Sequence, residues 1–341
     1  MRYLLFLLFC CFALAPTQEA RAQNVTRQAH PLAVDTAFLL PVNGVKQYLE
    51  IKGASRTKPV LLFIHGGPGW PATPMNRKYN RDLANDFVFV SWDQRNCGKS
   101  QTDTTVALTP DLYVEDAHQV TRFLQQAFHQ RKIFIVGHSW GSFVGAQLVQ
   151  RYPQDYAAYI GVSQLIDFGQ SALLTRTYVQ QQAALRHDTA TLHALARIPL
   201  SAATGFSGGP HDLFTFLALT GPYRSSPNVP ELPSPTQLYG DYPAPQWMAP
   251  VMRTLPPLFP YVNGGKTKLL QNSVFELPVY FFVGKYDHNT EPELARHYFA
   301  GLQAPKKQWF EFAHSGHAPN WEEPALFHRR LVQIAAENKS K

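Results

Sequence analysis

The chain has 341 residues, a formal net charge of +7 at pH 7 and a sequence pI of about 9.2. Its Lys and Arg residues are scattered, with short clusters such as Lys306-Lys307 and Arg329-Arg330 and no nucleic-acid-binding motif, so the charge does not indicate a nucleic-acid partner. The 13 histidines show no zinc-binding signature, and we expect neither a metal nor a cofactor. The length suits a core domain that carries an inserted second domain.

The N-terminus predicts export. Arg2 precedes an apolar run from Tyr3 to Ala15, and the segment Ala20–Ala22 then has the small-x-small pattern of a signal-peptidase site. We expect a signal peptide at residues 1–22, a periplasmic or extracellular protein and no stable membrane span after cleavage; an uncleaved anchor is the alternative. Cleavage would leave Cys97 as the only cysteine, which excludes an intramolecular disulfide and favours a buried thiol.

Apolar strands alternate with amphipathic helices up to about residue 165, as a doubly wound, mostly parallel sheet requires. Asn43-Gly44 predicts a hairpin turn before a strand at Val45–Ile51. Another strand, Val60–Ile64, runs into the glycine-rich loop His65–Gly69. Glycines in that position allow a backbone N–H to approach a developing oxyanion. A phosphate cradle is the alternative, but the loop has neither a P-loop ending nor a dinucleotide-binding G-x-G-x-x-G pattern.

A serine lies at the apex of a predicted strand–turn–helix. The strand is Ile133–Val136, the turn is Gly137–Gly141 with the pattern G-x-S-x-G, and the helix is Ser142–Arg151. The two glycines allow the tight turn that projects a serine hydroxyl at the start of a helix, where developing negative charge is favoured. We therefore expect Ser139 to be a nucleophile and the amide of Trp140, the next residue, to be one oxyanion donor.

Two further strands supply an acid and a base. Asp287 follows the apolar segment Leu277–Gly284, and His317 follows the strand pattern Lys307–Phe312. Because such folds place their chemistry at the carboxyl ends of parallel strands, Ser139, Asp287 and His317 are expected to meet there. His317 would accept the serine proton, and Asp287 would orient the imidazole. His314 is the rival base; His317 is preferred because it lies deeper in the loop after Gly316.

Residues 167–273 form a segment of different character, with helical patterns interrupted by dense proline between Pro227 and Pro260. Such a segment is either a cap over the site or a disordered insert. Its aromatic side chains favour an ordered cap that lines an apolar pocket. These aromatic residues are Tyr239, Tyr242, Trp247, Phe259 and Tyr261.

Three motifs together resemble the proline iminopeptidase family of α/β-hydrolases: His65–Gly69 (HGGPG), Asp93–Ser100 (DQRNCGKS) and Gly137–Ser142 (GHSWGS). The resemblance covers the core, about residues 35–165 and 275–335. It implies an α/β-hydrolase fold with an inserted helical cap, and it implies Gly67 and Trp140 as the oxyanion donors. It also implies release of N-terminal proline from peptides, with cap glutamates that bind the free amino group.

The sequence departs from that family in two places. Asn96 stands where the family usually has glycine, although asparagine also tolerates the left-handed conformation. The insert lacks the Trp-x-x-Trp-Glu element of many members, and its carboxylates are few. Since an ammonium group in a desolvated pocket needs an anionic partner, substrate-binding residues are not assigned. The carboxylates are Asp167, Asp188, Asp212, Glu231 and Asp241.

We therefore expect a signal peptide (1–22), a hydrolase core in two parts (23–166 and 274–341) and a cap (167–273). The predicted function is that of a secreted serine hydrolase, most specifically an aminopeptidase that releases N-terminal proline or another small residue from short peptides. An esterase or amidase acting on small acyl substrates is the alternative, and a non-catalytic ligand-binding protein on the same fold is a third possibility. An epoxide hydrolase or dehalogenase is disfavoured, because those chemistries need aspartate in place of Ser139.

Overall fold

The computed structural model describes residues 33–224, 226, 228–232, 240–242, 248–263 and 272–338. They all belong to one compact unit, Leu32–Lys341. The predicted signal peptide lies outside the described residues, as do two of the predicted pocket aromatics, Tyr239 and Trp247. Among the helices that are described, none combines the length and the apolar character needed to cross a bilayer.

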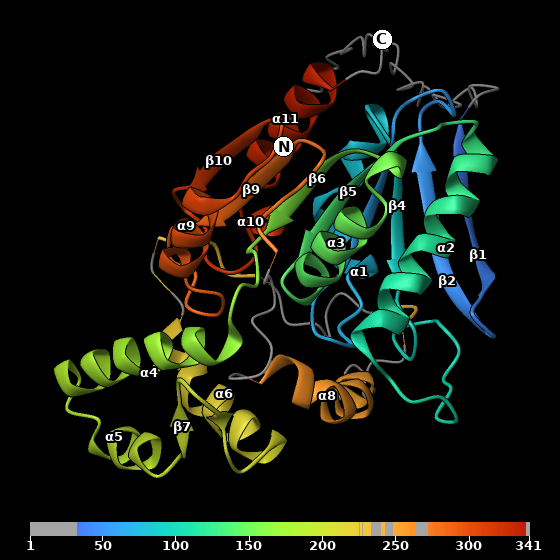
Figure 1. Cartoon of the computed structure of the whole chain (residues 1–341). Coiled ribbons are helices and arrows are strands. Elements are labelled where there is room, and N and C mark those ends of the chain that lie inside the picture. The colour runs from blue at the N-terminus through green and yellow to red at the C-terminus, as the bar shows by residue number, and fades with distance from the viewer. Residues whose placement is uncertain are drawn as a thin grey trace, which may run out of the picture. The chain divides into compact units, whose positions relative to one another are not determined.

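An eight-stranded sheet forms the centre of the unit, in the order β1-β2-β4-β3-β5-β6-β9-β10 (Figure 1). β2 is antiparallel to both of its neighbours, and every other pair is parallel, so the predicted α/β-hydrolase fold class is confirmed. The strands are β1 Val34–Val42, β2 Val45–Gly53, β3 Val60–Ile64, β4 Val88–Asp93, β5 Ile133–His138, β6 Tyr156–Val162, β9 Val279–Gly284 and β10 Lys307–Phe312.

The predicted hairpin joins β1 to β2. Asn43 and Gly44 have φ angles of 44° and 83°, and Val42 pairs directly with Val45. Asparagine and glycine tolerate positive φ at both central positions, which two-residue hairpins with a type I′ turn require. The parallel strands in the middle are buried on both faces, which explains why β3 is a continuous apolar run.

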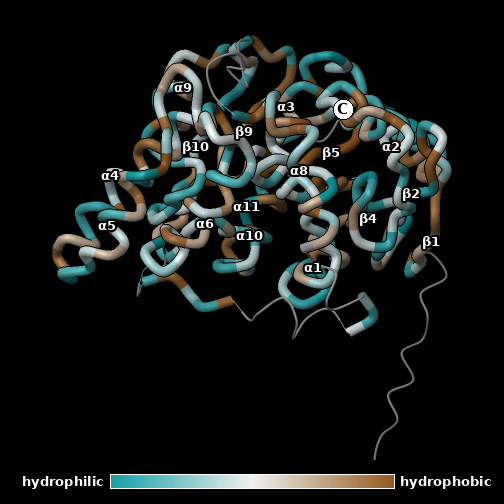
Figure 2. Tube along the Cα trace, turned by 90° about the horizontal axis from the view of Figure 1, so that it is seen from below, coloured by the Kyte–Doolittle hydropathy of each residue, from teal (hydrophilic) through white to brown (hydrophobic). Residues whose placement is uncertain are grey.

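Helices cover both faces of the sheet. One apolar cluster joins one face to α2 (Pro110–Phe128), α3 (Trp140–Arg151) and α9 (Pro292–Gly301). The other cluster joins the opposite face to α1 and α11. Figure 2 shows hydrophobic colouring along inner strands such as β5. The remaining helices of the core are α1 Thr73–Tyr79, η1 Arg81–Asn85, η2 Pro153–Asp155, α10 Pro319–Glu322 and α11 Pro324–Glu337.

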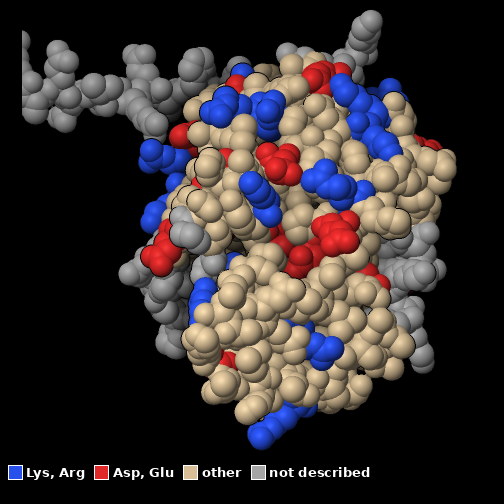
Figure 3. All heavy atoms as spheres, turned by 90° about the vertical axis from the view of Figure 1, so that its left-hand side faces the viewer, with Lys and Arg blue, Asp and Glu red and all other residues tan. Residues whose placement is uncertain are grey.

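A group of mainly helical elements lies between β6 and β9 in the sequence and beyond one end of the sheet in space (Figure 1). The two-stranded sheet β7–β8 within it was not predicted. The lower part of the surface in Figure 3, where these elements lie, carries few charged side chains. The domain boundaries at residues 166 and 273 stay a prediction. The elements are α4 Phe168–Leu185, α5 Thr189–Ala196, β7 Leu200–Ser201, β8 Gly205–Phe206, α6 Pro210–Arg224 and α8 Met248–Val262.

The expectation that dense proline interrupts the helices here is wrong for α8. This helix is continuous although it contains Pro256, Pro257 and Pro260. Each proline removes an N–H donor and disfavours a helix interior. Burial of one apolar face outweighs that preference, because tertiary packing supplies most of the stability of helices in proteins. The buried face consists of Val251, Leu255, Leu258, Phe259 and Val262.

Candidate active site

Ser139 lies in a sharp turn between β5 and α3. Its φ and ψ are 53° and −121°, a backbone conformation that residues other than glycine rarely adopt. The flanking glycines allow the chains to approach closely: a Cβ on Gly137 would lie 2.4 Å from the Gly141 carbonyl oxygen, and a Cβ on Gly141 would lie 2.0 Å from the Ile64 carbonyl oxygen. The turn therefore requires both glycines and holds the serine hydroxyl at the start of α3.

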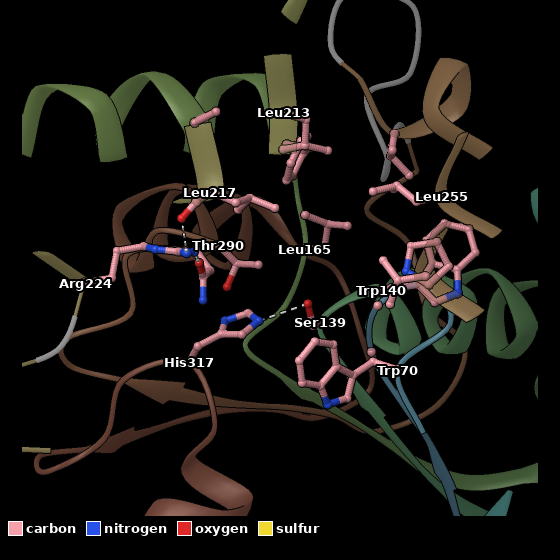
Figure 4. Close-up of a pocket in the computed structure, with 18 of the residues that line it drawn as sticks. Trp70, Ser139, Trp140, Leu165, Leu213, Leu217, Arg224, Leu255, Thr290 and His317 are labelled. Atoms are coloured by element: carbon pink, nitrogen blue, oxygen red, sulfur yellow. Dashed lines mark hydrogen bonds between the residues drawn. The ribbon is translucent and has the colours of Figure 1, made fainter. Parts of the chain in front are cut away.

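The structure brings the three residues nominated from the sequence together (Figure 4). Ser139 Oγ lies 3.0 Å from His317 Nε2, and His317 Nδ1 lies 3.0 and 3.1 Å from the two carboxylate oxygens of Asp287. Asp287 follows β9, and His317 follows β10, so the three side chains come from three loops at one edge of the sheet. This is the geometry that a nucleophile, a general base and an orienting acid require.

Asp287 is held as a carboxylate. Burial alone would raise its pKa, but the charge of His317 and hydrogen bonds from His317, Asn289 and Thr290 lower the pKa far below its usual range. The backbone amides of Asn289 and Thr290 donate at 2.8 and 3.1 Å, and the Thr290 hydroxyl donates at 2.7 Å. An ionised Asp287 fixes the Nδ1–H tautomer of His317 and leaves Nε2 to accept the serine proton.

The two candidate bases, His317 and His314, differ in their surroundings. His314 is exposed, and its backbone amide donates to Glu323. Next to His317, the Glu322 carboxylate accepts from the amides of Gly316 and Ala318 at 2.8 and 3.2 Å. Burial raises the pKa of Glu322 to about 7. The geometry therefore supports His317 as the base and adds Glu322 as the residue that holds its backbone.

Both expected oxyanion donors, Gly67 and Trp140, line the same cavity as Ser139. Trp140 is the first residue of α3, so its amide is among those that have no intrahelical acceptor. The loop with Gly67 passes close to the serine, because a Cβ on the neighbouring Gly66 would lie 3.1 Å from Ser139 Cβ. Side chains larger than hydrogen would thus crowd the position of a bound carbonyl oxygen.

Gln94 joins these two segments. Its side-chain amide donates to the His65 carbonyl oxygen at 2.7 Å, and its side-chain oxygen accepts from Trp140 Nε1 at 3.2 Å. The backbone amide of Gln94 donates to His65 Nε2 at 3.0 Å, and burial lowers the pKa of His65 to about 4. A neutral His65 and a single glutamine thus fix the oxyanion loop relative to the nucleophile turn.

Two expectations for the turn that follows β4, which contains Asn96 and Cys97, are confirmed. Asn96 has a φ of 61°, and its side chain exchanges two hydrogen bonds with the backbone of Asp103. Cys97 is 1% exposed, and burial raises the pKa of its thiol well above the usual value. The thiol therefore has little thiolate character, which makes it unreactive.

A cavity of about 1150 Å³ opens onto Ser139 and His317. Most of its lining is apolar, and Arg224 is the only Lys, Arg, Asp or Glu among the described residues that line it. The predicted apolar pocket is present, and cap aromatics such as Phe214 and Phe216 line it, but the described aromatics named from the sequence do not. Tyr242 instead donates to Asp93 at 2.9 Å, Phe259 is buried, and Tyr261 is partly exposed. The apolar lining includes Trp70, Leu165, Leu213, Leu217 and Leu255 (Figure 4).

None of the cap carboxylates lines the cavity. Asp167 and Asp188 accept from the first-turn amides of α4 and α5, and Asp212 accepts from the amide of Gly208. Asp241 pairs with Arg77 and Lys99 of the core. Only Glu231 is left; it is exposed, next to Leu232 of the cavity lining. The internal segments outside the described residues contain no Asp or Glu in their sequence.

The fold and the site together are those of an α/β-hydrolase, and a family model described as the alpha/beta hydrolase fold matches residues 59–324. The chain belongs to that family. It is 29% identical over 324 residues to the probable aminopeptidase YbaC of Bacillus subtilis, across 87% of this chain and 95% of that protein. It is 30% identical over 115 residues to the proline iminopeptidase of Thermoplasma volcanium, across 33% of this chain and 36% of that protein. Within that family, the chain is thus similar to proteins named aminopeptidase and proline iminopeptidase.

Solved structures of similar fold have varied activities. The proline iminopeptidase of Mycobacterium smegmatis matches with a TM-score of 0.60 and 18% identity, across 89% of this chain and 98% of that one. The 2-hydroxy-6-oxo-6-phenylhexa-2,4-dienoate hydrolase of Rhodococcus sp. strain RHA1 matches with a TM-score of 0.60 and 18% identity, across 89% of this chain and 99% of that one. At these identities the likeness establishes the fold alone.

Sequence reasoning missed Gln94, Glu322 and Arg224. Gln94 lies inside a motif that was singled out without a role for this residue. Glu322 had a weak signal, as a carboxylate at the start of a helix shortly after the candidate base. Arg224 had none, because only the folded structure shows that its side chain reaches Asn289 and lines the cavity.

Proposed function

We propose that this protein is a serine hydrolase that transfers an acyl group to Ser139 and then to water. The single observation that carries the proposal is the continuous chain of contacts from Ser139 Oγ through His317 to Asp287, each at 3.0 Å. A chance loop serine would not have both a base and an orienting acid within hydrogen-bond distance.

The first half of the reaction forms the acyl-enzyme. Ser139 Oγ attacks the substrate carbonyl carbon while His317 Nε2 takes the hydroxyl proton. The amides of Gly67 and Trp140 stabilise the negative oxygen of the tetrahedral intermediate. The bond to the leaving group then breaks, and the imidazolium of His317 gives its proton to the departing nitrogen or oxygen.

The second half releases the acid. A water molecule gives a proton to His317 and attacks the acyl carbon, and the ester bond to Ser139 breaks as the proton returns to Oγ. Asp287 stays ionised throughout and stabilises the imidazolium.

The first candidate activity is that of an aminopeptidase on short peptides with N-terminal proline or another small residue. Support comes from the relative named a probable aminopeptidase, which matches along almost its whole length, and from shorter relatives named proline iminopeptidases. Glu231 is the cap carboxylate best available to bind the substrate ammonium, since the other carboxylates of the cap have partners. Export of the protein is part of the same proposal and is supported by the sequence of residues 1–22.

The second candidate activity is that of an esterase or amidase without a requirement for a free amine. The observation that favours it is the cavity lining, in which no Asp or Glu is found among the described residues. An ammonium group placed in such an apolar cavity without an anionic partner would be strongly disfavoured. A non-catalytic binding protein is the weakest candidate, because a complete set of Ser139, His317 and Asp287 would then have no use.

Comparison of free and N-acetylated prolyl arylamides, with short acyl esters alongside, separates these candidates. An aminopeptidase should lose about a hundredfold or more in kcat/KM when the amine is blocked, because a carboxylate is left unpaired. Glu231→Gln should cause a similar loss with the free amine and little change with the blocked one. Equal cleavage of free and acetylated substrates would refute the aminopeptidase and favour the esterase.

A further inference from the structure

Arg224 places a positive charge in an otherwise uncharged part of the cavity. It is the last residue of α6, and its guanidinium extends from the cap toward Thr290 and His317 (Figure 4). Most of the lining around it is apolar, and no other Lys, Arg, Asp or Glu lines the described cavity. Because arginine keeps its proton in proteins, this charge is present at every pH at which the protein is folded.

The guanidinium is partly buried and has few hydrogen-bond partners. Nη2 donates to the Leu217 carbonyl oxygen at 3.3 Å, and Nη1 donates to the side-chain oxygen of Asn289. Nε is buried and has no hydrogen-bond acceptor among the described residues. Within that part of the chain, Arg224 also forms no ion pair with an Asp or Glu. Burial lowers the pKa of Arg224, and only the more distant charge of Asp287 opposes this effect.

A partly desolvated cation without an anionic partner is unfavourable, and here the charge faces an open cavity. A purely structural role, in which Arg224 links the cap to the core by hydrogen bonds, would not require a charge, because both acceptors of Arg224 are neutral oxygens. Asp287 is already engaged by His317, Asn289 and Thr290. The arrangement therefore has room for an anion supplied from outside the chain.

Arg224 lies on the leaving-group side of the site. Its partner Asn289 is two residues from Asp287, and Figure 4 shows Arg224 and Thr290 on the His317 side of Ser139. Trp140, which would provide an oxyanion donor, and Leu255 lie on the opposite side. Since His317 must protonate the leaving group, the departing fragment has to occupy the side on which Arg224 is found.

We propose that Arg224 binds a carboxylate on the leaving group of the substrate. The substrate class would then be small molecules whose departing half ends in a carboxylate, such as dipeptides with a free C-terminus or esters of hydroxy acids. This inference rests on the proposed acyl transfer at Ser139, but it holds for either candidate activity. A guanidinium suits the role because its planar donors match the two oxygens of a carboxylate.

Matched substrate pairs test the proposal. The first pair is Pro-Ala and Pro-Ala amide, and the second is the butyryl esters of 4-hydroxybenzoate and of 4-hydroxybenzamide. In each pair the carboxylate should raise kcat/KM by about tenfold to a hundredfold, as expected for a charge-assisted hydrogen bond. A third ester, phenyl hemisuccinate, has its carboxylate on the acyl side and should gain nothing over phenyl butyrate.

Variants connect the preference to the residue. We call the ratio of kcat/KM for the carboxylate substrate to kcat/KM for its amide partner the carboxylate preference. Arg224→Gln should reduce this ratio to about one. Arg224→Lys should restore part of it, because lysine keeps the charge without the planar donors. Arg176→Gln is the matched control: Arg176 also donates to backbone carbonyl oxygens in the cap, those of Ile198 and Leu200, but does not line the cavity. It should keep the wild-type preference, which excludes a merely structural effect.

Binding provides a readout that does not depend on turnover. In calorimetric titrations of the wild-type protein, 4-hydroxybenzoate should bind about tenfold or more tightly than 4-hydroxybenzamide, and Arg224→Gln should abolish the difference. Equal binding of the two compounds, or an unchanged preference in Arg224→Gln, would overturn the proposal. A gain with phenyl hemisuccinate would overturn the leaving-group placement.

The same experiments keep this inference apart from the proposed function. Ester cleavage with a carboxylate preference but no peptide cleavage would reject the aminopeptidase and support the role of Arg224. No turnover of any substrate, with tight and Arg224-dependent binding of 4-hydroxybenzoate, would reject the hydrolase and keep the carboxylate site.

Discussion

His138 holds the backbone of His317 in place. Its Nε2 donates to the His317 carbonyl oxygen at 2.8 Å, and the two rings lie 5.1 Å apart at an angle of 47°. Burial, with a contribution from the charge of His317, lowers the pKa of His138 to about 3, so that the ring is neutral and donates through Nε2. Because His138 directly precedes Ser139, one hydrogen bond fixes the nucleophile turn relative to the loop of the base.

Ser139→Ala should abolish turnover and leave the fold intact. The side chain contributes a nucleophile and little packing, and loss of such a residue typically lowers kcat by several orders of magnitude. The measurement is kcat on the best arylamide or ester, with circular dichroism to compare folding. If the variant keeps more than about a tenth of the wild-type rate, Ser139 is not the nucleophile.

His317→Ala should be as inactive as Ser139→Ala, whereas the exposed His314→Ala should keep most of the wild-type activity. In the wild type, kcat/KM should fall on the acid side, because His317 must be neutral to accept a proton. Asp287 cannot cause this fall, since its pKa lies far below the usual range. A rate that does not fall at acid pH, or an inactive His314→Ala, would reject the choice of base.

Glu322 should act as a positioning residue for His317. Glu322→Ala removes the acceptor of the Gly316 and Ala318 amides, and we expect kcat to fall by about tenfold or more through misplacement of the imidazole. Glu322→Gln keeps a side-chain oxygen acceptor and should retain most of the activity. Equal losses in the two variants would show that the charge, and not the hydrogen bonds, matters.

The lowered pKa of His138 should make the fold sensitive to acid. Between the unfolded value of 6.5 and the folded value of about 3, only the unfolded chain binds this proton, so stability is full above pH 6.5 and is lost as the pH falls. The contribution to this loss at pH 5 is on the order of 2 kcal/mol. His138→Gln keeps a donor but cannot titrate.

Urea unfolding at pH 5 and pH 7 tests this prediction. The difference in the free energy of unfolding between the two pH values should be smaller in His138→Gln than in the wild type. Equal differences would show that His138 titrates alike in the folded and unfolded chains.

Local patterns predicted five of the eight strands of the large sheet and the three residues that meet at the ends of three of them. Ser139, Asp287 and His317 each follow a strand with a clear apolar pattern, and parallel strands bring such loops together. The catalytic roles stay a prediction until variants are measured.

The cap was much less predictable. Helix α8 forms across three prolines because its apolar face is buried against the rest of the unit, and local propensity contains no information about that packing. For the same reason, Arg224 acquires part of its environment from Asn289, which is 65 residues away in the sequence. Tyr242 was expected in the pocket but donates to Asp93 of the core, a partner that composition alone could not identify.

Because Cys97 is buried, cysteines introduced elsewhere can be labelled with dyes to follow the cap by fluorescence. No other cysteine is found among the described residues, and this one is shielded from reagents. In protein that lacks residues 1–22, and with them Cys10 and Cys11, a cysteine introduced at Leu185, 75% exposed on α4, would therefore react selectively with a maleimide dye. With a second label at Val332 on α11, energy transfer between the dyes would report whether the distance between α4 and α11 changes when a substrate binds.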